Sequence, residues 1–183
     1  MIQDFLMPFF AISIAELGDK TQLSILLLSS KTREHFKLLL GVMLAFLVVD
    51  GVAVAAGSWA VNLVPAEVLK IMSGLVFILF GVLAFLSKES DHLEKLSSGN
   101  PLVSGFTVIL LAEWGDKTQV ASALFATRYS PFFVLAGALT ALAILSILAV
   151  YLGKTISGRI DKKVMATAAG IVFMAMGASF ILL

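Results

Sequence analysis

The chain has 183 residues, of which 60% are hydrophobic and only 14% are charged, and its formal net charge is +1. Soluble domains carry about 25% charged residues, so this composition excludes a soluble domain and predicts an all-α integral membrane protein. The near-neutral charge, without a basic run, gives no reason to expect nucleic acid as a partner. The chain has no cysteine, which excludes disulfides and thiolate metal sites.

Six long apolar stretches follow one another along the chain. A helix needs about 20 mostly apolar residues to cross a bilayer, and each stretch meets that requirement. The N-terminal residues lack a basic segment and a cleavage-site pattern, so we interpret the first stretch as a retained helix and not a cleaved signal. In chain order, the predicted spans are 5–29, 38–61, 67–86, 102–126, 131–152 and 164–183.

The distribution of lysine and arginine predicts the orientation in the membrane. The first, third and fifth connections hold nine of these residues, whereas the opposite side has only Lys70 and Arg128. Because basic loops stay in the cytoplasm, we expect the odd-numbered connections to be cytoplasmic. Both termini are therefore expected to be extracytoplasmic.

One charged octad occurs twice inside apolar stretches. "AELGDKTQ" covers 15–22 and "AEWGDKTQ" covers 112–119. Glycines recur at nearly the same offset, as Gly41 with Gly137 and Gly74 with Gly170. We therefore divide the chain into a first repeat at 1–90, a cytoplasmic linker at 91–100 and a second repeat at 101–183.

Each repeat contains three spans, and three is an odd number. The second repeat must therefore insert upside down relative to the first. Inverted repeats related by an in-plane pseudo-two-fold axis are typical of transporters, whose site lies near the membrane midplane at the repeat interface. The sequence thus predicts two inverted three-helix repeats, with the first and fourth spans carrying the site.

The two motifs place acidic side chains in the middle of predicted spans. A carboxylate there costs several kcal/mol unless it is paired, hydrated or protonated. The spacing of Glu16, Asp19 and Gln22 puts these side chains on one helix face, and the pseudo-two-fold axis would bring the second stripe against it. Oxygen-only ligands suit hard cations such as Mn²⁺, Ca²⁺ and Mg²⁺. The second stripe consists of Glu113, Asp116 and Gln119.

Glycine and threonine residues complete each motif. Gly18 and Gly115 are expected to let helices approach closely. Gly-Asp is also a poor helix interior, which favours an unwound segment that offers backbone carbonyls. Thr21 and Thr118 fit two roles equally well, as additional hydroxyl ligands or as side chains bonded to their own preceding turn.

The charges of the motifs suggest what the site exchanges. Four carboxylates with Lys20 and Lys117 leave a net charge of −2. One divalent cation would neutralise this charge, and so would two protons, which predicts an exchange of one for the other. Charge balance is one role for the lysines. A local ion pair between Lys20 and Glu16, four residues apart, is an equally simple one.

Asp50 is the remaining acid within a predicted span. It lies in the middle of 38–61, where the second repeat has Ser146. Three roles remain open for it: a proton carrier, an additional cation ligand, or a structural residue held by a hydrogen bond.

Two copies of E-x-G-D-[KR]-[TS] on the first and fourth spans resemble a family of small membrane cation transporters. Its eukaryotic members include Golgi exchangers of Mn²⁺ and Ca²⁺ for protons, and its bacterial members are manganese exporters. The resemblance implies export of Mn²⁺, with Ca²⁺ as second candidate, by a multi-pass protein of a bacterial inner membrane. It also implies functional roles for Glu16, Asp19, Glu113 and Asp116. The metal would be the substrate, without any cofactor.

Other interpretations remain open at this point. The carboxylates could bind the ammonium group of a cationic amino acid or amine, with Lys20 and Lys117 as donors to its carboxylate. Asp19 and Asp116 bring an intramembrane aspartyl protease to mind, although its signature glycine is replaced by glutamate, and we expect no enzyme. The motifs could also be buried ion pairs that lock two helices together, or the wall of a channel. The oligomeric state is not predicted.

Overall fold

The computed structural model describes residues 1–86, 99–156 and 162–182, and all regular secondary structure within these ranges is helical. Most of the predicted linker at 91–100 lies outside the described residues, as do Lys88, Lys95 and Arg159. The helices are α1 (Ile2–Glu16), α2 (Lys20–Ser30), α3 (His35–Ala60), α4 (Ala66–Leu86), α5 (Pro101–Glu113), α6 (Lys117–Ala126), α7 (Pro131–Ile156) and α8 (Lys162–Leu182).

Three helices are long and apolar enough to cross a membrane: α3, α4 over Ala66–Ala84, and α7 over Pro131–Tyr151. Pro101–Glu113 and Thr167–Leu182 form shorter apolar helices. Large apolar side chains are exposed along these elements, including Leu47 on α3, Leu79 on α4 and Ile147 on α7. Such an outer surface is favourable against lipid chains. The chain is therefore a multi-pass membrane protein.

The predicted spans 5–29 and 102–126 are each interrupted at the charged motif. α1 ends at Glu16 and α2 begins at Lys20, and α5 and α6 are separated in the same way. The sequence-based prediction of an unwound Gly-Asp segment is thus confirmed. Gly18 and Gly115 both have a φ of 81°, a left-handed conformation that only glycine adopts without strain. Close helix approach is the wrong explanation for Gly115, because a Cβ there would meet nothing within 4 Å.

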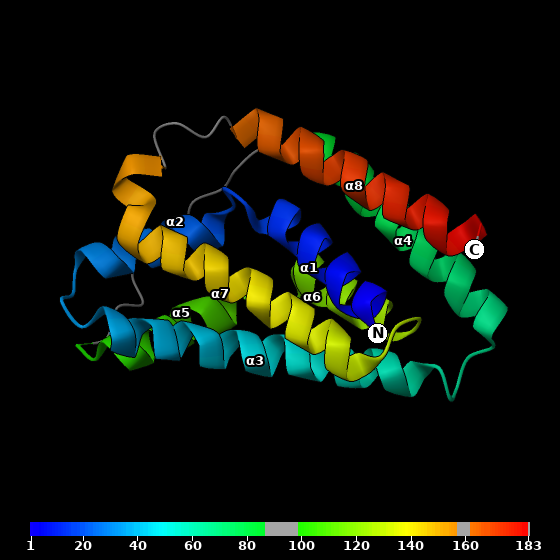
Figure 1. Cartoon of the computed structure of the whole chain (residues 1–183), viewed down its shortest axis with the longest axis horizontal. Coiled ribbons are helices and arrows are strands. Elements are labelled where there is room, and N and C mark those ends of the chain that lie inside the picture. The colour runs from blue at the N-terminus through cyan, green and yellow to red at the C-terminus, as the bar shows by residue number, and fades with distance from the viewer. Residues whose placement is uncertain (87–98, 157–161, 183) are drawn as a thin grey trace.

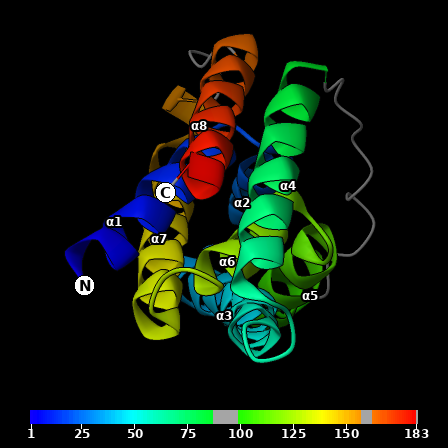
Figure 2. The same cartoon turned by 90° about the vertical axis from the view of Figure 1, so that its right-hand side faces the viewer.

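The two halves of the chain pack through equivalent surfaces (Figures 1 and 2). α1 lies against α7, α5 lies against α3, and α4 pairs with α8. A Cβ on Gly41 would overlap the carbonyl oxygen of Leu102 on α5, and a Cβ on Gly137 would overlap that of Phe5 on α1. These two contacts correspond to each other in the repeat. Close approach therefore explains these two glycines, in contrast to Gly115 of the second motif.

Phenylalanine side chains join the α4–α8 pair to the centre of the molecule. The ring centroid of Phe77 on α4 lies 5.1 Å from that of Phe125 on α6 and 5.3 Å from that of Phe180 on α8. All three rings are buried. This layer fixes α6, which begins at the second charged motif. The two termini lie at the same end of the molecule (Figure 1).

A pair of glycines on α3 tests the importance of close packing. Gly41→Ala should lower stability by about 1–3 kcal/mol, because the methyl group has no room beside α5. Gly51→Ala on the same helix is the matched control, since its Cβ meets nothing within 4 Å. It should be neutral or slightly stabilising because alanine favours helix. The measurement is the unfolding temperature of each variant in detergent. Equal values for the two variants would contradict the close packing of Gly41 against α5.

Candidate cation site

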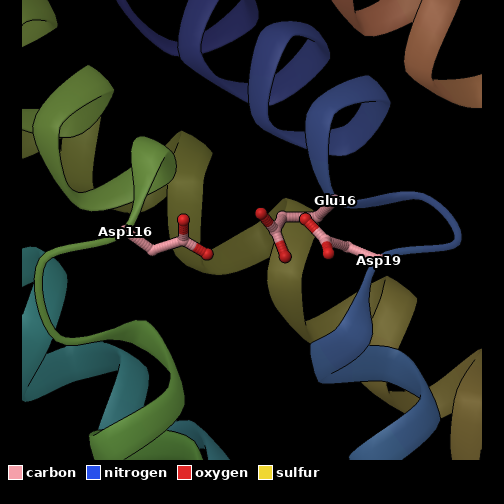
Figure 3. A group of neighbouring side chains, drawn as sticks. All are labelled: Glu16, Asp19 and Asp116. Carbon is pink, nitrogen blue, oxygen red and sulfur yellow. The ribbon is translucent and has the colours of Figure 1, made fainter. Parts of the chain in front are cut away.

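Three carboxylates from both charged motifs converge where α1 and α5 end. Oxygen atoms of Glu16, Asp19 and Asp116 lie within 4.8 Å of one another. Figure 3 shows the three side chains pointing toward one another, with Glu16 and Asp19 on one side and Asp116 on the other. The tertiary fold thus brings together acids that are about a hundred residues apart in the sequence.

Two oxygens of this group lack a hydrogen-bond donor among the described residues. They are Oε1 of Glu16 and Oδ2 of Asp116, and both atoms are buried. Glu16 is only 2% exposed. Burying a carboxylate oxygen without a hydrogen-bond donor is costly, so this arrangement favours a positively charged ligand or a proton at these atoms.

Glu113 is held differently from Glu16. Its Oε1 accepts a short hydrogen bond from the Thr21 hydroxyl, and its Oε2 accepts one from Thr118 at 3.1 Å. All three side chains are buried. The threonines therefore bond a glutamate of the site and not their own preceding turns. The pseudo-symmetric sequence thus folds into an asymmetric site, with one glutamate bonded by two hydroxyls and the other left with an open oxygen.

The two glutamines brace the interruptions of the helices. Gln22 accepts a hydrogen bond from the Gly18 N–H at 3.2 Å and donates to the Glu16 carbonyl at 2.5 Å. Gln119 accepts from the Gly115 N–H at 2.6 Å and donates to the carbonyl of Val49 at 3.3 Å. Both amide groups are therefore engaged with the backbone.

The aspartates start the helices that follow the interruptions. Asp19 Oδ1 accepts from the Lys20 N–H at 2.6 Å, and Asp116 Oδ1 accepts from the Lys117 N–H at 2.7 Å. These bonds satisfy N–H groups that a helix start leaves unpaired. Each aspartate is consequently fixed in place, and its other oxygen is directed at the opposite motif.

The lysines cross between the motifs. Nζ of Lys20 lies 3.4 Å from Oδ2 of Asp116, and Nζ of Lys117 forms a close ion pair with Oδ2 of Asp19. The 3.4 Å pair is an electrostatic contact that does not satisfy Asp116 Oδ2 as a hydrogen bond. Lys20 thus pairs with an aspartate of the second motif, whereas the sequence suggested a local pair with Glu16.

Asp50 lies on α3 and is 2% exposed. The hydroxyl of Ser122 on α6 donates to its Oδ1 at 2.7 Å. The repeat offset places Ser146 opposite Asp50 and Ile25 opposite Ser122. This acid–hydroxyl pair therefore joins the two halves of the chain and has no counterpart at the equivalent positions. Sequence reasoning missed Ser122, because no spacing connects it to an acid 72 residues away.

Comparison with known proteins identifies the family. The family described as "Divalent cation/proton antiporter GDT1" matches residues 4–92 and 101–182. The chain belongs to the GDT1 family. This confirms the resemblance recognised from the doubled motif, and it makes the chain a transporter of divalent cations. A transporter family also agrees with the expectation that the chain is not an enzyme.

Several proteins are similar to this chain along most of its length. A protein named "Putative manganese exporter" from Vibrio cholerae is 28% identical over 145 residues, covering 78% of this chain and 72% of the relative. A GDT1-like protein of Synechocystis is 26% identical and covers 94% of both chains. GDT1-like protein 5 of Oryza sativa is 24% identical over 90% of this chain and 88% of the relative. No solved structure matches.

The left-handed glycines of the site lead to a test of the interruption. Gly115→Ala should destabilise the protein by about 1–2 kcal/mol through backbone strain alone, because space is open around a Cβ at this position. Gly115→Asn should be less damaging, since asparagine tolerates a positive φ better than alanine. The comparison is made from unfolding temperatures in detergent. If Gly115→Ala is as stable as the unchanged protein, the turn does not require glycine.

Proposed function

We propose that this GDT1 family member exports a hard divalent cation from the cytosol in exchange for protons. Mn²⁺ is the first candidate and Ca²⁺ the second. The cation binds between the two charged motifs, at Glu16, Asp19 and Asp116, with Glu113 beside them. One observation carries the proposal: three carboxylates from both motifs lie within 4.8 Å, and two of their buried oxygens lack a donor.

The chemistry of the ligands supports a hard cation. The group offers carboxylate oxygens alone, which suit Mn²⁺, Ca²⁺ or Mg²⁺ better than Cu⁺ or Zn²⁺. His35 is not in the group and packs instead against the Tyr151 ring. The name of the Vibrio cholerae relative favours manganese among the hard cations.

The charge balance supports proton exchange. Four motif carboxylates and two paired lysines leave a charge of −2, which one divalent cation or two protons would neutralise. A net charge is very unfavourable at membrane depth, so the site should be loaded with one or the other as it changes its access. Asp50 is a further candidate for carrying a proton, since it is buried with a single hydroxyl donor at 2.7 Å.

Two inverted three-helix repeats in six spans would provide alternating access. The interrupted spans at α1–α2 and α5–α6 would carry the site, and the repeats would rock around it. The reciprocal packing of α1 on α7 and α5 on α3 supports this arrangement. Termini at the same end of the molecule fit an even number of spans. We infer extracytoplasmic termini from the basic connections. The location in a bacterial inner membrane follows from the resemblance of the doubled motif.

The cationic amino acid remains the competing substrate. Its ammonium group could bind the carboxylates, but its carboxylate would need a donor. Lys20 and Lys117 are the cationic candidates of the motifs, and each already pairs with an aspartate. In this arrangement neither ammonium group is free to bind the carboxylate of an amino acid.

Transport by purified protein in liposomes tests the proposal. Mn²⁺ is added outside vesicles that contain a pH-sensitive dye, and entry of the metal should make the lumen more alkaline. Glu16→Gln should abolish both signals, because it removes the negative charge of the carboxylate whose Oε1 has no donor. Glu67→Gln, an exposed acid at the start of α4, is the matched control and should transport normally. Mn²⁺ entry without alkalinisation would refute proton exchange, and uptake of labelled lysine in place of Mn²⁺ would establish the competing substrate.

The asymmetric bonding of the two glutamates predicts unequal effects on binding. Glu113→Gln can keep two hydrogen bonds, because each threonine hydroxyl can accept as well as donate. Glu16→Gln removes the negative charge at an atom without a donor. Equilibrium binding of Mn²⁺ should therefore weaken more in Glu16→Gln, by about tenfold or more relative to Glu113→Gln. Equal losses would contradict distinct roles for the two glutamates.

A further inference from the structure

The ammonium groups of the two motifs lie where the transported cation would have to bind. Lys117 pairs with Asp19 and Lys20 lies 3.4 Å from Asp116, so each motif supplies the counter-charge for the other. Asp19 and Asp116 are also two of the three acids in the converging group. The same carboxylates are thus available to a tethered cation and to a soluble one.

We propose that Lys20 and Lys117 are built-in competitors of the transported cation, which hold the aspartates between loadings and must be displaced when the metal binds. This inference rests on the proposed function and adds a step to it. What changes is the partner of each aspartate, from an ammonium group to the metal.

The bonding of Asp19 brings the lysine and the metal into competition. Its Oδ1 caps the helix that begins at Lys20, and its Oδ2 faces the ammonium group of Lys117. Each oxygen thus has one of its two acceptor directions occupied, and a metal bound there would have to share the oxygen with its donor or displace that donor. Breaking the cap would leave a helix N–H group unpaired, whereas an ammonium group can move toward water. The ion pair is therefore the contact that gives way.

Electrostatic repulsion acts in the same direction. A divalent cation held by Glu16, Asp19 and Asp116 would lie a few Å from both ammonium groups, and like charges repel strongly where little water screens them. Both lysine side chains are partly exposed. The side chain of Lys20 is 43% exposed and that of Lys117 is 30% exposed, whereas Glu16 is buried.

The two competitors are not equal. Lys20 has the longer contact and the more exposed side chain, so it should leave first and hold its aspartate less firmly. Lys117 is the closer partner and should oppose the metal more strongly. Both pairs bridge the two halves of the chain, so binding of the metal replaces two links between the repeats by one shared ion.

A purely structural ion pair makes the opposite prediction. If the lysines only hold the motifs together, removal of one should loosen the site and weaken the binding of metal. If they compete, removal should tighten binding. The sign of the change in affinity therefore separates the two roles.

The experiment is equilibrium binding of Mn²⁺ to purified full-length protein. Lys117→Met should bind Mn²⁺ about tenfold more tightly or better, and Lys20→Met should show a smaller gain, because partly exposed charges are screened. Lys117→Arg keeps the positive charge, so its affinity for Mn²⁺ should remain within about threefold of that of the unchanged protein. This change is smaller than the one expected when the charge is removed. The matched control is Lys37→Met, which breaks an exposed ion pair with Glu34 outside the site and should leave the affinity unchanged.

Thermal unfolding gives a second readout on the same samples. Without metal, Lys117→Met should unfold at a lower temperature because Asp19 loses its partner. Added Mn²⁺ should raise its unfolding temperature more than that of the unchanged protein, because tighter ligands stabilise more at a given concentration. Lys20→Met serves the same comparison if Lys117→Met does not fold.

Each outcome separates the inference from the function on which it rests. Tighter binding in the methionine variants supports the competition. Binding of Mn²⁺ to the unchanged protein, with equal or weaker binding in the folded methionine variants, overturns the competition and leaves the proposed function intact. If the unchanged protein binds no more Mn²⁺ than Glu16→Gln does at any concentration used, both the competition and the proposed function are overturned.

Discussion

The structure depends on one constraint, which is the cost of burying carboxylates in an apolar protein. Glu16 and Glu113 are each 2% exposed, in a chain that is 60% hydrophobic. A buried charge must find a partner, a proton or an ion. Interrupted helices, cross-motif ion pairs and buried threonine hydroxyls all lie around these two acids. The surrounding helices can be understood as the scaffold that holds this charged centre away from lipid.

The interruptions make such a centre possible. At each of them, a left-handed glycine turns the chain and an aspartate starts the next helix, while a glutamine side chain bonds the backbone of the turn. An uninterrupted helix would satisfy its own backbone and would hold the acids along one face. The broken helix instead ends with Glu16 and restarts from Asp19, so both carboxylates reach the same point. Backbone polarity is tolerated here because side chains of the motif satisfy it.

A repeated sequence does not give equivalent environments. Glu113 accepts two hydroxyl groups, whereas Glu16 keeps an oxygen without a donor. Asp50 and Ser122 form a buried pair for which the repeat offers serine and isoleucine. Within the part of the chain that the structure describes, these two asymmetries make the halves of the site chemically different.

The sequence by itself determined the helical membrane class, the doubled motif, the interruption at Gly-Asp and the choice of Glu16, Asp19, Glu113 and Asp116 as the acids of interest. Hydropathy, glycine conformation and the cost of a membrane carboxylate are local properties, so they can be predicted from the amino-acid sequence alone. Only the tertiary structure decided that Glu113 stands outside the group of three, that the threonines bond it, and that each lysine crosses to the other motif. The pairing of Ser122 with Asp50 was likewise decided only by the tertiary structure. These contacts depend on the angle and depth at which distant helices pack, and side chains of the same residue type separate by a few Å according to that packing.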